Sequence, residues 1–175
     1  MNKIILICCL SITSLISAQE TMTMLGKYYP AAPIWNFICE NYAYSGIIQL
    51  QIAKTEKGGL LKIMADTNDS SHAISGNIYI DLSNMSTIIC TDKNRREING
   101  NQIISYYSLT PTEINRLKNN EIQSLRFAIK GKSDAFSSQT GHFTALNKMK
   151  YFATVYDNKE KRYPTVAAII ELFKK

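Results

Sequence analysis

The segment Ser105–Gly131 constrains the fold more tightly than any other part of the chain, because it predicts a strand, a short helix and a second strand in succession. Thr110 is a favourable N-cap, a proline suited to the first helical position follows it, and Glu113 stands where a capping box needs an acid. Asn119–Asn120 predicts a left-handed exit from the helix. We therefore expect a helix near 111–119.

Most of the remaining chain predicts strands. Residues 47–53 and 60–65 alternate apolar and polar side chains around a turn, and Asn99-Gly100 is a strong hairpin signal. Further strands are expected at 34–39, 78–82, 87–91, 95–98, 101–109, 125–129 and 143–156, with 151–156 the firmest part of the last. Pro164 begins an amphipathic helix near 164–174, whose apolar face is expected to hold Val166, Ile169, Ile170 and Phe173. This pattern predicts an α+β protein, a predominantly antiparallel sheet or sandwich with two small helices.

Residues 1–18 have the layout of a secretory signal peptide, with Lys3, an apolar run and a small residue at Ala18. A membrane anchor or lipidation at Cys8 or Cys9 is the alternative. The interpretation we favour is cleavage followed by a loose lead-in at 19–33 and a single globular domain at 34–175, located outside the cell or in the periplasm. No later segment predicts a membrane span.

Cys39 and Cys90 remain after such a cleavage, and the sequence leaves two alternatives for them. In an oxidising compartment an even pair predicts a disulfide bridge. Both residues also lie in apolar surroundings, where cysteine packs as a small buried thiol.

The usual catalytic patterns are absent from the sequence. His72 follows two aspartates in a polar loop at 66–75, which favours a surface loop over a metal site, and we expect no metal or cofactor. His142 lies beside serines without a nucleophile elbow. A small secreted hydrolase therefore remains only as an alternative, using His142 or carboxylates drawn from Glu40, Asp66, Asp81, Asp92 and Glu97.

Tyrosines near turns are the best candidates for a binding surface, namely Tyr28, Tyr29, Tyr42 and Tyr44. The net charge of +6 favours anionic partners, although the cations are scattered along the sequence. We therefore expect a non-enzymatic binding or structural protein that contacts an envelope component, a glycan or another protein. Nucleic acid is the less favoured partner.

Overall fold

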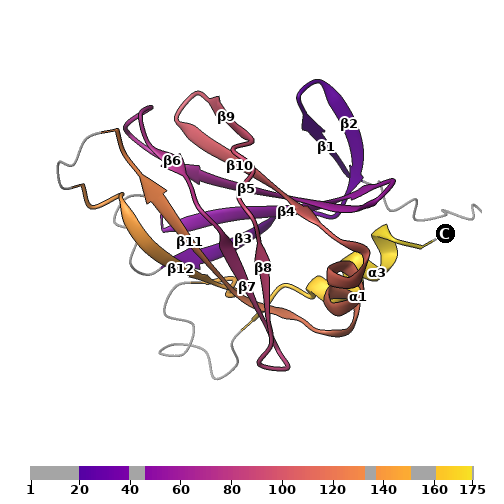
Figure 1. Cartoon of the computed structure of the whole chain (residues 1–175). Helices are drawn as coiled ribbons and strands as arrows, with labels where there is room; N and C mark the ends of the chain where they lie inside the picture. The colour runs from indigo at the N-terminus through magenta and orange to yellow at the C-terminus, as the bar shows by residue number, and fades with distance from the viewer. Residues whose placement is uncertain (1–19, 40–45, 133–136, 151–160, 175) are drawn as a thin grey trace, which may run out of the picture.

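The computed structural model describes residues 20–39, 46–132, 137–150 and 161–174, which form one strongly curved antiparallel sheet and two short helices (Figure 1). The expected α+β class is confirmed. The strands are β1 (Glu20–Met24), β2 (Lys27–Ala31), β3 (Trp35–Cys39), β4 (Ile47–Thr55), β5 (Gly58–Asp66), β6 (Ala73–Ile74), β7 (Ile78–Leu82), β8 (Thr87–Cys90), β9 (Arg96–Asn99), β10 (Gln102–Leu109), β11 (Ile122–Lys130) and β12 (Gly141–Leu146). The helices are α1 (Pro111–Asn119) and α3 (Thr165–Leu172). Neither of these described helices is long and apolar enough to cross a bilayer.

The main path of the sheet runs β8-β7-β11-β12-β3-β4-β5-β10-β9, and β6 joins β11. The predicted β4–β5 and β9–β10 hairpins are confirmed, and the strands expected at 78–82 and 87–91 pair as a β7–β8 hairpin. The signal peptide, Cys8, Cys9 and the 151–156 segment lie outside the described residues. β12 ends at Leu146 and the chain bends after it, so the expected strand does not continue through 147–150.

The expectation of a loose lead-in before Ile34 is wrong for residues 20–31. They form the β1–β2 hairpin, which pairs from Glu20↔Ala31 to Met24↔Lys27. Pro30 is accommodated because β2 lies off the main path and pairs with β4 only at Ala31↔Ala53. Proline is excluded from the interior of a sheet but not from such a margin.

The predicted capping box of α1 is confirmed. The backbone N of Glu113 donates to Thr110 Oγ1 over 3.3 Å, and the backbone N of Thr110 donates to Glu113 Oε2 over 2.6 Å. The predicted left-handed exit is wrong, because Asn120 is extended at φ −142°. The side-chain amides of Asn119 and Asn120 instead donate to backbone carbonyls one turn earlier, which satisfies the helix end without a left-handed residue.

Helix α3 is also present as predicted, but its buried face is rotated. Thr165, Ile169 and Leu172 are buried, whereas Ile170 is 43% exposed. The polar Thr165 is drawn inward because its hydroxyl accepts a hydrogen bond from the backbone N of Ile122 and donates to the carboxylate of Glu121. Hydrogen bonds at the start of the helix therefore set its rotation.

β5 and β10 are buried on both faces. On one face Leu61 and Tyr107 belong to the main core, which the two helices complete with residues such as Leu117 and Ile169. The opposite face carries a second cluster, made of Met22, Ala31, Ala53, Leu60, Met64, Ile104 and Tyr106. Because successive side chains of a strand point to opposite faces, this second cluster lies beneath the β1–β2 hairpin.

Cys39 and Cys90 are both buried in the main core as thiols and are not joined to each other. This arrangement corresponds to the buried-thiol alternative. Burial, and to a lesser extent the nearby Glu113 carboxylate, raises the pKa of Cys90 to about 12. The Cys90 thiol is therefore protonated at neutral pH and unsuited to act as a nucleophile.

Candidate functional site: a basic groove beside the β1–β2 hairpin

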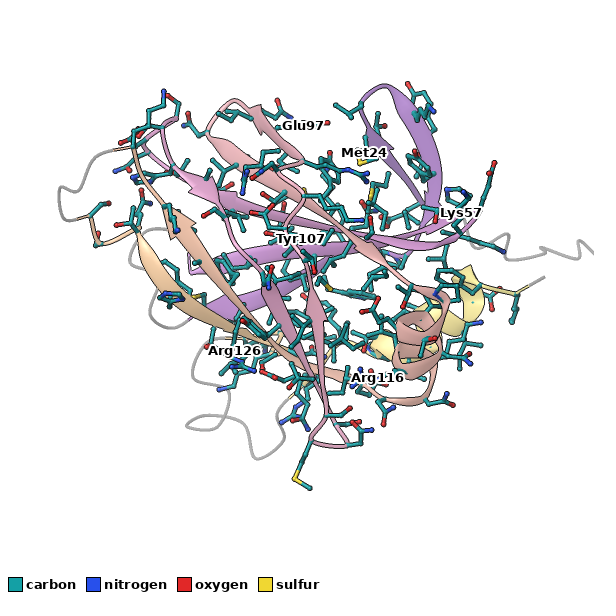
Figure 2. All side chains as sticks on the ribbon, viewed as in Figure 1. Met24, Lys57, Glu97, Tyr107, Arg116 and Arg126 are labelled. Atoms are coloured by element: carbon teal, nitrogen blue, oxygen red, sulfur yellow. The ribbon has the colours of Figure 1, made fainter. Side chains whose placement is uncertain are left out.

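A groove of about 730 Å³ lies between the β1–β2 hairpin, the turn that joins β4 to β5, and the end of β10. We call it the basic groove. Four cations line it, Lys27, Lys54, Lys57 and Arg95, against the single carboxylate of Glu56. Figure 2 shows Lys57 beside the hairpin that carries Met24.

Two of the predicted binding residues lie in the basic groove. Tyr28 is 76% exposed, and Tyr29 is half-buried against the second cluster. The apolar side chains of Met24, Leu60 and Leu109 also line it. Tyr42 and Tyr44, the other two predicted residues, lie outside the described residues.

The hairpin wall of the groove is held by Glu97 and by the Tyr106 hydroxyl, which lies 3.1 Å from the carbonyl oxygen of Thr23. Glu97 Oε1 accepts a hydrogen bond from the backbone N of Leu25, over 3.2 Å, at the hairpin tip. Glu97 Oε2 accepts one from the Tyr106 hydroxyl over 2.8 Å. Burial, together with Glu97, raises the pKa of Tyr106, so the phenol remains a donor.

The tip of the hairpin is a tight turn in which Leu25 and Gly26 both have positive φ, 49° and 76°. Such turns match the twist of two paired strands. Leu25 is 75% exposed there, although a branched apolar side chain is uncommon in the left-handed region. The Leu25–Glu97 hydrogen bond accounts for the fixed position of the tip beside β9.

The opposite wall depends on two glycines. A Cβ on Gly58 would lie 2.3 Å from the carbonyl oxygen of Leu109, and Gly58 has φ +138°. A Cβ on Gly59 would lie 2.6 Å from Ile114 Cδ1. The β4–β5 turn thus packs closely against the end of β10 and α1, and this packing positions Lys57 at the groove.

Three cations of the basic groove have no ion-pair partner in the described part of the chain: Lys27, Lys57 and Arg95. The fourth, Lys54, donates from Nζ to the carbonyl of Lys174 over 3.1 Å. The groove therefore presents uncompensated positive charge next to exposed aromatic surface. This arrangement suits an anionic ligand with apolar faces.

The predicted catalytic alternatives are not brought together. His142 is exposed on β12 opposite Ala128, in a shallow recess of about 420 Å³ that also holds Tyr79 and Arg126. Within the described residues, its ring makes no hydrogen bond. Asp134, the acid nearest in sequence, lies outside those residues.

Four of the five carboxylates considered for a hydrolase lie in the described residues, and each of these four binds a different partner. Asp81 binds Arg126 through two contacts of 2.9 Å, Asp92 is ion-paired with Arg96, and Glu97 holds the hairpin. Asp66 accepts a hydrogen bond from the side chain of Gln102 over 3.2 Å. Glu40 lies outside the described residues.

His72 is buried rather than part of a solvated loop surface. Its Nδ1 lies 2.9 Å from Thr67 Oγ1, and its Nε2 lies 3.6 Å from the exposed carboxylate of Asp69. No group of three metal-binding side chains occurs among the described residues. In this part of the chain His72 serves to fix the loop.

No protein-family model, curated protein or solved structure matches this chain. Tyr28 and Tyr29, which the sequence predicts as candidate binding residues, line the groove together with Lys27, Lys57 and Arg95, which the sequence does not single out because they lie in three separate segments. Only their assembly by the fold distinguishes them from ordinary surface cations.

Proposed function

We propose that the protein is an exported, non-enzymatic binding domain whose basic groove holds an acidic glycan. The observation that carries this proposal is the excess of four cations over one carboxylate beside two tyrosines. Lysine and arginine bind carboxylate or sulfate groups, and an exposed tyrosine ring stacks on the apolar face of a sugar.

The size of the groove supports a small ligand segment rather than a flat protein contact. Its volume of about 730 Å³ is in the range of typical ligand sites. The apolar side chains that line it favour a ligand with carbon-rich faces, which distinguishes a sugar ring from a simple inorganic anion. Export by the signal peptide at 1–18 would place such a protein among envelope or extracellular glycans.

The test is the binding of acidic oligosaccharides by the purified protein, measured by calorimetry at two salt concentrations. Replacing Lys27, Lys57 and Arg95 together with alanine is expected to weaken binding by about tenfold or more, since each exposed charge contributes up to about 1 kcal/mol. The matched control replaces Lys132, Lys150 and Lys161 with alanine, three exposed cations outside the groove.

Tyr28→Ala separates stacking from charge. It is expected to weaken the binding of sugars while leaving the salt dependence unchanged, because no charge is removed. Equal binding of acidic and neutral oligosaccharides, or equal losses in the groove variant and its control, would contradict the proposal. Preferential binding of single-stranded nucleic acid would point to a different class of partner.

A further inference from the structure

A second groove, of about 470 Å³, adjoins the basic groove on the side of α3. We call it the neutral groove. Pro30 and Lys54 line both grooves, so the two cavities meet at these residues. Lys54 stands at the junction, with its ammonium held by the carbonyl of Lys174 just beyond the end of α3.

The charges of the neutral groove are balanced. Glu20 and Glu171 line it together with Lys54 and Lys174. Glu171 is ion-paired with Lys174, and Glu20 accepts a hydrogen bond from the side chain of Gln51 over 3.3 Å. Unlike the basic groove, this one offers no net charge to attract an anion.

The walls of the neutral groove are short apolar side chains. Ala31 and Ala32 lie on the strand side, and Ala168 and Leu172 lie on the helix side. Alanine at 168 leaves open space between α3 and β2 that a larger side chain would fill. The groove therefore has room for an uncharged unit and no cation free to bind an acidic one.

We propose that the ligand is an oligosaccharide in which acidic and neutral sugars alternate, with an acidic unit in the basic groove and a neutral unit in the neutral groove. This inference rests on the proposed function of the basic groove and adds the composition and minimum length of its ligand. A polymer made only of uronic acids would bring a carboxylate into a groove where Lys54 is held by the Lys174 carbonyl and Lys174 by Glu171, so it would gain no free counter-charge there. A neutral polymer would leave the cations of the basic groove without a counter-charge.

The experiment compares two series of mono-, di-, tetra- and hexasaccharides on the full protein, each beginning with its acidic monosaccharide. One is hyaluronan, in which glucuronate alternates with N-acetylglucosamine, and the other is oligogalacturonate, in which every unit is acidic. We expect hyaluronan affinity to rise by about tenfold or more between the shortest and longest oligomers. The affinity for oligogalacturonates should stop rising with length once the basic groove is filled.

Three variants test whether the gain in affinity arises in the neutral groove. Ala168→Trp fills that groove and should abolish the length-dependent gain, whereas Ala167→Trp, on the exposed face of the same helix, should not. Glu171→Lys gives the neutral groove a net positive charge and should let longer oligogalacturonates gain affinity. The third variant changes an exposed side chain and tests the proposal even if the tryptophan variants fold poorly.

The outcomes are distinguishable. If neither series binds, the proposed function of the basic groove fails. If short acidic oligosaccharides bind but length and Glu171→Lys have no effect, the basic groove stands and the alternating ligand is overturned. A length-dependent gain that survives Ala168→Trp would place the additional contacts elsewhere and would also overturn it.

Discussion

The two faces of β5 and β10 are covered in different ways. The main core is closed by two helices that bury residues such as Leu117 and Ile169 completely. The second cluster is closed by the β1–β2 hairpin, which joins the sheet at a single β-bridge and is also held by side-chain hydrogen bonds that involve Glu97, Tyr106 and Gln51. The helices seal one face, whereas the narrow hairpin leaves open grooves along its sides.

This contrast separates the face that supplies most of the stability from the face to which we assign binding. Apolar burial on the helix-covered face supplies much of the free energy of folding. The hairpin side adds a smaller cluster and polar contacts, and it carries the exposed tyrosines and cations. The following experiments test that division, from the largest expected effect to the smallest.

The largest effect is expected from truncation in the main core. Leu61→Ala should lower the free energy of unfolding by about 4 kcal/mol, because the closely packed surroundings of Leu61 cannot collapse onto the cavity. Met22→Ala, in the second cluster, should cost about 2 kcal/mol, because the hairpin can move inward. Urea denaturation measures both values. Equal losses would mean that hairpin and helices hold their clusters equally firmly.

A smaller effect is expected at the turn that carries Lys57. Gly58→Ala should destabilise the protein by about 3 kcal/mol, since the new Cβ meets the Leu109 carbonyl and φ is +138°. Gly26→Ala, at the hairpin tip, should cost only about 1 kcal/mol, because its left-handed conformation has open space around it. Thermal unfolding compares the two. A larger loss of stability in Gly26→Ala than in Gly58→Ala would contradict the conclusion that the hairpin covers its face of the sheet only loosely.

Two adjacent tyrosines on opposite faces provide a test of the hairpin anchor. Tyr106→Phe removes the donor to Glu97 and should cost about 1 kcal/mol. Tyr107→Phe removes a hydrogen bond of 3.2 Å to the Gly76 carbonyl at a similar cost. Hydrogen exchange should accelerate across residues 20–31 only in Tyr106→Phe. Faster exchange of that hairpin in both variants would show that it is not anchored locally.

The smallest effect concerns Asp81, a partly exposed residue on strand β7. Burial would raise the pKa of Asp81, but hydrogen bonds from Arg126, Thr87 and Ser124 outweigh it and lower the pKa. A depressed folded-state pKa stabilises the fold above the unfolded value of about 4, and this contribution is lost as the pH falls through the folded value.

Asp81→Asn should therefore reduce stability at pH 7 by less than about 1 kcal/mol, since the pair with Arg126 is partly solvated. The difference from the unaltered protein should shrink toward zero on acidification. Denaturation at a series of pH values measures it. A difference that is constant with pH would mean that Asp81 acts through packing rather than charge.

The local elements were largely predictable from the sequence. The α1 capping box was found because its three determinants lie within four consecutive residues, and the hairpins were found because turn and alternation are local signals. The β1–β2 hairpin was missed because Pro30 argues against a sheet interior and no local signal shows that β2 lies at a margin. The buried face of α3 was predicted incorrectly because Thr165 is drawn inward by a hydrogen bond to Glu121, which is distant in sequence.

The sequence by itself determined the strand and helix segments, the helix cap and the excess of basic residues. Only the tertiary structure decided that β5 and β10 are covered on both faces, that Cys39 and Cys90 remain thiols, and that Lys27, Lys57 and Arg95 share one groove. The physical reason is the distance along the sequence over which each kind of interaction acts. Backbone preferences and caps act within a few residues, whereas burial and electrostatic fields depend on which distant segments the fold places side by side.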